Sequence, residues 1–137
     1  MFKKSNKPNK YRNEKVTIGD ITFASKKESQ RYLFLKDAEA KGLISNLELQ
    51  PKFELVPAIK ETYIEHLKTK DKVKERTLQK PIHYIGDFSY IKDGERIIED
   101  VKGSEYMLTK EFELKFKMMR YFHNIEIKLI YKPTAPI

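Results

Sequence analysis

The sequence contains no cysteine and no long apolar stretch, and each absence excludes a class of protein. Without cysteine the chain can form neither disulfides nor thiolate metal sites, which fits a reducing, cytoplasmic setting. No stretch approaches the roughly 20 consecutive apolar residues that are needed to cross a bilayer. The N-terminal segment is charged but has no apolar segment behind it, unlike a secretory signal. We therefore expect a cytoplasmic protein without a membrane partner.

The sequence has an excess of positive charge, with 28 Lys and Arg against 20 Asp and Glu and a formal net charge of +8. A balance this basic favours a polyanionic partner, which is nucleic acid or an anionic membrane surface. The alternative is a lysine-rich face that only keeps the domain in solution.

The 137 residues are enough for one domain that buries a core of its own. We expect this domain at residues 16–132, with a basic N-terminal arm at 1–15 and a C-terminal tail at 133–137. The arm is rich in Lys, Asn and Pro, and it either contacts phosphates or keeps the protein in solution.

A small hairpin and a capped helix are predicted at the start of the domain. Residues 16–24 alternate apolar and polar side chains around Gly19-Asp20, which is typical of a hairpin. Ser25 then begins a helix, because Ser25 and Glu28 fit the capping box. In that box the serine caps one backbone N–H and the glutamate reaches back to another. Gly42 suits the end of the helix.

An interrupted strand and a lysine-rich insertion follow. Two apolar-rich stretches at 43–50 and 52–56 predict an extended strand that is broken at Pro51. Residues 57–80 predict a long hairpin, a loose amphipathic helix or a mobile loop, and a loop of this length in a compact domain is usually functional or disordered. The lysines of this insertion either follow a phosphate backbone or form a solvated charged face.

The C-terminal half predicts a hairpin, a helix and a last strand. Asp93-Gly94 lies between two alternating strands and marks a type I′ hairpin turn. Residues 125–131 alternate again and predict the last strand. Residues 104–123 predict a helix whose core face follows three- and four-residue spacing: Leu108, Phe112, Phe116, Met119 and Phe122 or His123. The order helix, three strands, helix, strand predicts an α/β (α+β) domain with a central mixed β-sheet flanked by helices.

The predicted turn places two aspartates opposite each other. Counting outward from Asp93-Gly94, Asp87 faces Asp100 across the hairpin. Because side chains alternate along a strand, Lys102 shares their face and Glu99 points to the other. Directly opposed residues have Cβ atoms roughly 4.5–5.5 Å apart. Two ionised carboxylates at that range repel each other by several kcal/mol at an effective dielectric of about 20.

Three things could relieve this repulsion: a proton on one acid, a bound cation, or a different register. A hard divalent cation is the most economical, because Mg²⁺ needs only one or two protein carboxylates among its oxygen ligands; we expect Mn²⁺ to substitute. Asp87 and Asp100 would supply two ligands and the backbone carbonyl of Val101 a third. Lys102 could hold a water or hydroxide near the metal or neutralise charge in a transition state. The alternative for Lys102 is a surface pair with an acid.

Two segments on successive predicted strands resemble the motif of the PD-(D/E)xK nuclease superfamily: Gly86-Asp87-Phe88 and Asp100-Val101-Lys102. This superfamily has a restriction-endonuclease-like αβββαβ core. Gly86 occupies the position before the first acid, where members of the superfamily usually have proline. The resemblance implies Mg²⁺-dependent phosphodiester hydrolysis with Asp87, Asp100 and Lys102 as catalytic residues. Members often add a glutamate from the first helix, which implies that Glu28 assists at the metal, directly or through water. As a capping residue, Glu28 needs no such role.

A wider resemblance covers residues 9–131 apart from 57–80. The segments NKYRNEKV, FASKKES, LQPKFEL, GDFSY and IEDVKG, in this order, are similar to those of a family of small phage and prophage proteins. This implies an endodeoxyribonuclease in a bacterial host cell, acting on DNA that includes branched, recombination or replication intermediates. A homodimer and phage replication or recombination proteins are further expected partners. The alternatives are a non-catalytic DNA-binding or partner-binding module that keeps the nuclease fold, and a structural phage protein.

Several other residues are candidates with a competing explanation. Those for DNA contact are Lys26, Lys27, Gln50, Lys110, Lys115 and Lys117. The lysines could equally be solvated, and Gln50 could equally shape the turn before Pro51. None of the three histidines has metal-ligand spacing, and His123 is expected at a helix end. Tyr84 and Phe88 are expected on the packed face opposite the aspartates.

Overall fold

The computed structural model describes residues 14–137, so most of the expected basic arm lies outside the described residues. This part of the chain forms ten strands, two α-helices and one short 3-10 helix. The strands are β1 (Val16–Ile18), β2 (Ile21–Phe23), β3 (Ser45–Leu49), β4 (Lys52–Val56), β5 (Ile59–His66), β6 (Asp71–Gln79), β7 (Ile82–Ile85), β8 (Phe88–Lys92), β9 (Glu95–Val101) and β10 (Lys128–Ile130). The helices are α1 (Lys26–Ala40), η1 (Glu105–Met107) and α2 (Lys110–His123).

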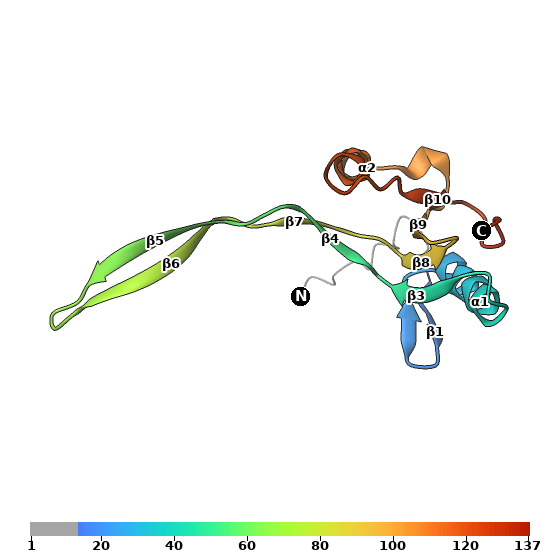
Figure 1. Ribbon diagram of the computed structural model, residues 1–137, viewed down its shortest axis with the longest axis horizontal. Helices are drawn as coiled ribbons and strands as arrows, with labels where there is room; N and C mark the ends of the chain where they lie inside the picture. The colour runs from blue at the N-terminus through green and yellow to red at the C-terminus, as the bar shows by residue number, and fades with distance from the viewer. Residues whose placement is uncertain (1–13) are drawn as a thin grey trace, which may run out of the picture.

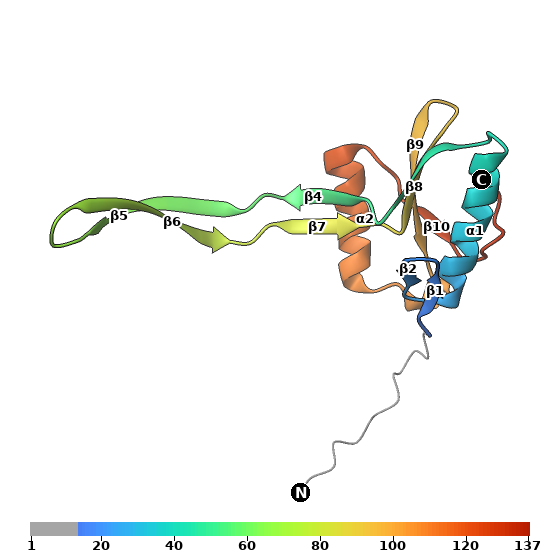
Figure 2. The same cartoon turned by 90° about the horizontal axis from the view of Figure 1, so that it is seen from below.

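A four-stranded mixed sheet forms the centre of the domain, with the strand order β10-β9-β8-β3. β9 and β10 are parallel, whereas β8 is antiparallel to both β3 and β9. The helices α1 and α2 lie on opposite sides of this sheet (Figure 2). The order α1, β3, β8, β9, α2, β10 is the predicted helix, three strands, helix, strand. The α/β (α+β) prediction with a central mixed sheet is therefore confirmed.

Each face of the sheet carries its own apolar core. α1 and the β1–β2 hairpin pack on one face, around Leu35 and Phe88, and α2 packs on the other, around Ile98 and Met119. Because side chains alternate along β9, Ile97 joins the first core and Ile98 the second. Phe88 thus lies on the predicted packed face.

The first helix begins and ends where its capping residues predict. Ser25 is the N-cap, and its hydroxyl accepts a hydrogen bond from the Glu28 N–H at 3.2 Å. The helix ends at Ala40, and Gly42 follows with a left-handed φ of 75°. The predicted hairpin before the helix is also present as β1 and β2.

The chain changes pairing partners at two points that lie together. β3 pairs with β8, whereas β4 pairs with β7 in a separate two-stranded sheet. One change falls at Gln50, which has a φ of 49° and directly precedes Pro51, the predicted break of the strand. The other falls at Gly86-Asp87. The Gln50 N–H donates to the Asp87 carbonyl at 3.0 Å, and the Gly86 N–H donates to the Pro51 carbonyl at 2.9 Å. These bonds fix the two breaks to each other.

The β8–β9 hairpin has the predicted turn and register. Asp93 and Gly94 have φ values of 50° and 80°, both positive as a type I′ turn requires. The paired residues follow the predicted count from the turn to Phe88 opposite Glu99. Asp87 lies one residue beyond this ladder, and its N–H donates to the Glu99 carbonyl at 3.0 Å.

The lysine-rich insertion is a hairpin, which is one of its three predicted alternatives. β5 and β6 pair along their length in antiparallel fashion. They continue the direction of β4 and β7 and project far from the rest of the domain (Figure 1).

The second helix starts later than predicted. Residues 104–109 do not belong to it, because Leu108 is extended and Thr109 is the N-cap, its hydroxyl accepting from the Phe112 N–H at 3.1 Å. Among the predicted core-face residues Phe112 and Met119 are buried, Leu108 and Phe116 pack against them, and Phe122 is exposed. His123 is the last helical residue, as expected, and its ring hydrogen-bonds the Glu54 carbonyl at 2.7 Å. The last strand is shorter than the predicted 125–131.

A buried ion pair joins α1 to β9. Arg31 and Glu99 have no exposed surface, and the guanidinium donates to both carboxylate oxygens, at 2.8 and 2.5 Å. The Tyr90 hydroxyl also donates to Glu99, at 2.6 Å. Arg31 further donates to the backbone oxygens of Pro133 and Ala135 at 3.0 and 2.6 Å, which fastens the C-terminal tail to α1. Glu99 therefore points away from the two aspartates, as predicted.

Candidate active site

Asp87 and Asp100 are neighbours at the end of the β8–β9 hairpin. Asp87 lies in the break between β7 and β8, and its Oδ2 accepts a hydrogen bond from the Val101 N–H at 2.7 Å. Asp100 precedes Val101 on β9 and is 7% exposed. The carboxylate of Asp87 is thus held against the β9 backbone within electrostatic reach of Asp100.

Both carboxylate oxygens of Asp100 have protein partners. The Tyr84 hydroxyl donates to Oδ2 at 2.7 Å, and Lys102 Nζ lies 2.9 Å from Oδ1. The prediction that Tyr84 lies on the opposite face is therefore wrong. The break at Gly86 interrupts the alternation between β7 and β8, so counting by twos from Asp87 does not carry across it. Burial and the charge of Asp100 raise the pKa of Tyr84, which keeps its hydroxyl a donor.

Lys102 shares the face of Asp100, as alternation along β9 predicts. Its ammonium also lies over the ring of Phe112, 3.7 Å from the centroid. Lys27 of α1 donates to the backbone oxygens of Lys102 and Gly103 at 3.3 and 3.2 Å, which anchors the chain just after the strand. The alternative explanation of Lys102, a pair with an acid, also describes its contact with Asp100.

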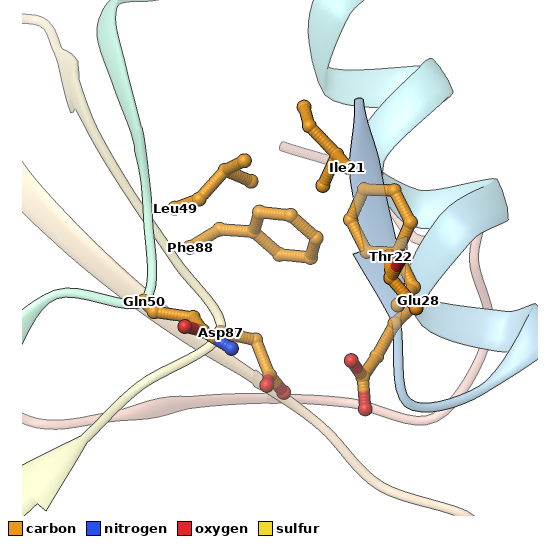
Figure 3. A pocket seen from close by; sticks show the side chains of 8 residues that line it. Ile21, Thr22, Glu28, Leu49, Gln50, Asp87 and Phe88 are labelled. Atoms are coloured by element: carbon orange, nitrogen blue, oxygen red, sulfur yellow. The ribbon is translucent and has the colours of Figure 1, made fainter. Parts of the chain in front are cut away.

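Glu28 and Asp87 open into one pocket, although they come from different elements (Figure 3). Their carboxylates point into the same space, with the Gln50 side chain beside Asp87. The Ser25 hydroxyl caps the backbone N–H of Glu28, and the Glu28 carboxylate itself lines the pocket. The pocket has a volume of about 110 Å³ and is lined by Ile21, Thr22, Phe23, Glu28, Leu49, Gln50, Asp87 and Phe88.

Negative charge is poorly compensated at this site. Burial raises the pKa of Asp87 to about 7, together with the charges of Asp100 and Glu28, and the Val101 N–H and Lys102 oppose this only in part. Burial also raises the pKa of Glu28, to which the charge of Asp100 contributes, against hydrogen bonds from Ala24 and Ser25. The predicted repulsion between the aspartates is therefore present and extends to Glu28.

A second pocket gives access to Asp100 and Lys102. It has a volume of about 280 Å³ and is lined by His83, Tyr84, Ile85, Asp100, Lys102, Thr109, Glu111, Phe112 and Lys115. It lies between β7 and the first turns of α2, so a ligand there would meet the Asp100–Lys102 pair.

The weaker candidates for DNA contact are placed differently. Lys115 lines the second pocket but pairs with Glu111 at 3.0 Å, and Gln50 both shapes the turn and lines the first pocket. Lys27 uses its ammonium on the backbone after β9. Three others are exposed to solvent: Lys26, Lys110 and Lys117.

Oxygen ligands for a divalent cation are available, although no larger cluster converges. Within residues 14–137, no group of three or more His, Cys, Asp or Glu side chains is close enough to hold one metal ion. Mg²⁺ requires only one or two protein carboxylates and keeps several waters, so Asp87 and Asp100 are sufficient in number. The raised pKa of Asp87 marks uncompensated negative charge, which a cation would stabilise. The donor set is compatible with Mg²⁺ or Mn²⁺.

Gly86 allows the close approach that builds the site. A Cβ at this position would lie 3.1 Å from Ile98, 3.3 Å from Pro51 and 3.4 Å from the Tyr84 hydroxyl. We expect Gly86→Ala to lower the free energy of unfolding by about 1–3 kcal/mol, because the core has no room for the methyl group. Urea unfolding measures this change, and a stability equal to wild type would contradict the close packing. Proline would in addition remove the N–H that donates to Pro51.

Asp87→Asn is expected to stabilise the protein at high pH. The pKa of Asp87 is raised from its ordinary 3.8 to about 7 on folding, so the folded state binds the proton more tightly. The cost of ionising Asp87 in the fold is therefore absent below about pH 4, grows as the pH rises to about 7 and is constant above, with a ceiling near 4 kcal/mol. Asparagine is never charged, and its amide oxygen can still accept from the Val101 N–H.

The measurement is the difference in unfolding free energy between wild type and Asp87→Asn across this pH range. We expect the advantage of the variant to grow between about pH 4 and pH 7. A difference that does not depend on pH would contradict the crowded-charge description of the site.

The fold and site define a mixed α+β protein with two neighbouring aspartates, a paired lysine and a glutamate across a pocket. A family model described as a protein of unknown function (DUF1064) matches residues 8–135, and the chain belongs to this family. A search of the curated proteins and a search of the solved structures each found no match. Among the described residues, no helix is long and apolar enough to cross a membrane.

Proposed function

We propose that this protein is a Mg²⁺-dependent nuclease that hydrolyses DNA phosphodiesters. The observation that carries the proposal is the meeting of Asp87, Asp100 and Lys102 at the end of one hairpin, with Glu28 facing Asp87 across a pocket. The αβββαβ order of the central elements and the resemblance to the PD-(D/E)xK superfamily support it.

Each residue of the site has a role in this proposal. Asp87 and Asp100 would hold the cation, with the Val101 carbonyl as a further ligand and Glu28 assisting directly or through water. When bound, such a cation supplies Lewis-acid activation of water and neutralises charge on the phosphate. The Lys102 ammonium, already 2.9 Å from Asp100, would position the attacking water and stabilise developing negative charge. Tyr84 would orient Asp100 through its hydrogen bond.

The substrate in this proposal is DNA, and the net charge of +8 supports it. Binding through phosphate contacts should weaken steeply with salt. If the chain comes from a phage or prophage, as the wider resemblance implies, its substrates would include branched replication or recombination intermediates, and duplex cutting would favour a homodimer.

The test is incubation of the protein with supercoiled, linear and branched DNA, in Mg²⁺, in Mn²⁺ and in EDTA. We expect cleavage of at least one of these DNAs with either metal and none in EDTA. An RNA duplex in parallel separates DNA from RNA cleavage. Failure to cut any substrate with either metal would reject the nuclease proposal.

Metal binding has a readout that does not depend on cleavage. We expect Mg²⁺ or Mn²⁺ to raise the melting temperature of the wild-type protein, because a ligand that binds only the folded state stabilises it. Asp87→Asn should lose this shift, since it lacks one of the two proposed ligands. Differential scanning fluorimetry with Na⁺ at matched ionic strength is the control. An equal shift in both proteins would place the metal elsewhere.

A second candidate function is a non-catalytic DNA-binding module. The observation that favours it is that both Asp100 oxygens already have protein partners, in Tyr84 and Lys102. Such a module would bind DNA equally well with and without metal and would cut no substrate. The cleavage panel combined with a binding assay in EDTA separates the two functions.

A further inference from the structure

The β5–β6 hairpin is an arm that stands apart from both cores of the domain. The two strands pair only with each other, and no residue of either is buried. Both views show the arm extending away from the helices and the mixed sheet (Figures 1 and 2). Any function of the arm therefore depends on its exposed side chains.

One face of the arm is occupied by contacts that hold the two strands together. Arg76 pairs with Glu61 across the strands and lies over the Tyr63 ring, 5.3 Å from the centroid, and Lys74 pairs with Glu65. Each cross-strand pair of this kind contributes about 0.2–1 kcal/mol. A two-stranded hairpin alone is only marginally stable in water, so these pairs help to keep the arm extended.

The tip of the arm carries three lysines around a single acid, Asp71, which contacts the His66 ring. Lys68, Lys70 and Lys72 are exposed, and within residues 14–137 none of the three forms an ion pair. Leu67 projects from the same turn with 43% of its surface exposed, and its N–H donates to the Lys70 carbonyl at 3.0 Å. An exposed apolar residue near three exposed lysines suits a partner that offers both phosphates and apolar base surfaces.

We infer that the β5–β6 arm grips duplex DNA by lying in a groove, with the three tip lysines on phosphates. The major groove of DNA admits a two-stranded β-ribbon. The eight residues of β5 span about 26 Å, the length of about eight base pairs. Leu67 at the tip is exposed and would make apolar contact with base edges in the same groove, such as the thymine methyl group.

The arm leads directly to the candidate active site. β7 continues from the arm, and His83, Tyr84 and Ile85 on it line the pocket that contains Asp100 and Lys102. A duplex held along the arm would therefore extend toward that pocket. The inference rests on DNA as the substrate of the proposed function, but it does not require that the DNA be cut.

Charge complementarity decides in favour of DNA over a second copy of the chain. Residues 57–80 carry seven Lys and Arg against four Asp and Glu, so two arms would repel each other. The arm also exposes apolar residues: Ile64 and Val73 lie opposite each other with 56% and 69% exposed, and Ile59 and Leu78 near its base are 49% and 57% exposed. The three tip lysines form no ion pair within residues 14–137 and remain available to phosphates.

The test replaces Lys68, Lys70 and Lys72 together with glutamine and measures binding to a fluorescent DNA duplex in EDTA by anisotropy. We expect affinity at low salt to fall at least about tenfold, and the slope of log K against log salt to become shallower by about 2–3, because three phosphate contacts are lost. The matched control removes the same charge from three exposed lysines outside the arm: Lys36, Lys41 and Lys132.

The control variant should keep the affinity and salt slope of wild type much more closely. Equal losses in both triple variants would overturn the inference, since only the net charge would then matter. So would wild-type affinity in the tip variant, or a wild-type protein that binds no duplex at low salt. These binding measurements contain no metal and do not depend on cleavage. If the protein never cuts DNA but binds it through the arm, the nuclease proposal is rejected and the inference about the arm stands.

Self-association through the arm is tested by analytical ultracentrifugation of the double variant Ile64→Ser/Val73→Ser, which removes the opposed apolar pair. We expect this variant to keep the oligomeric state of wild type. A wild-type dimer that the double serine variant separates, with unchanged DNA binding by the tip variant, would assign the arm to self-association and overturn the inference.

Discussion

Asp100→Asn is expected to slow Mg²⁺-dependent DNA cleavage by at least about 1000-fold. Asparagine has the shape of aspartate, and its amide oxygen can still accept the Tyr84 hydroxyl, so the fold should persist. The change removes one of the two charges proposed to hold the cation and the anionic partner of Lys102. Single-turnover cleavage at saturating DNA measures the rate separately from binding.

The matched control is Asp93→Asn, which makes the same change in the same hairpin. Asp93 occupies the turn at the other end with a φ of 50°, a conformation that asparagine adopts readily. We expect this variant to cleave at the wild-type rate. Cleavage by Asp100→Asn at the rate of Asp93→Asn would remove Asp100 from the active site.

Arg31→Met is expected to lower the free energy of unfolding by about 3–5 kcal/mol, a large part of the stability of a typical domain. The change leaves the Glu99 carboxylate in a site with no exposed surface and without its cation. It also takes away the donors that hold the backbone oxygens of Pro133 and Ala135. Chemical unfolding followed by circular dichroism measures the loss.

Two further variants separate the loss of the buried ion pair from the loss of an exposed one. Lys36→Met, on the same helix, breaks the exposed Lys36–Glu39 pair and should cost at most about 1 kcal/mol. Arg31→Met combined with Glu99→Leu should recover part of the loss, because no charge is then left buried alone. If Arg31→Met proves as stable as Lys36→Met, the buried pair does not hold α1 to the sheet.

Local patterns predicted the part of the site that lies on one hairpin. The Asp93-Gly94 turn specifies the register, and the register brings Asp87 next to Asp100 and separates Glu99 from both. The fold order followed in the same way from hairpin, helix and strand patterns. These features depend on residues that are close in sequence, and the hydrophobic periodicity of a segment directly reflects such local structure.

The parts that escaped prediction depend on breaks or on distant partners. Tyr84 reaches Asp100 only because the chain changes sheets at Gly86, and alternation does not cross such a break. Arg31 and Glu99 lie 68 residues apart, and neither pattern nor spacing marks them as partners. The late start of α2 had a local signal in Thr109, a suitable N-cap that the apolar periodicity concealed.

The most direct test of the metal-dependent site compares wild type and Asp87→Asn in the same buffer, at a pH well above the Asp87 pKa. Nicking of supercoiled plasmid and the melting temperature are recorded together. We expect wild type to nick the plasmid in Mg²⁺ but not in EDTA. The variant should leave the plasmid intact in Mg²⁺ and should melt at a higher temperature than wild type in EDTA, where no metal compensates the Asp87 charge. Loss of cleavage in a more stable protein cannot come from unfolding. Nicking by the variant at the wild-type rate would contradict the proposed role of Asp87.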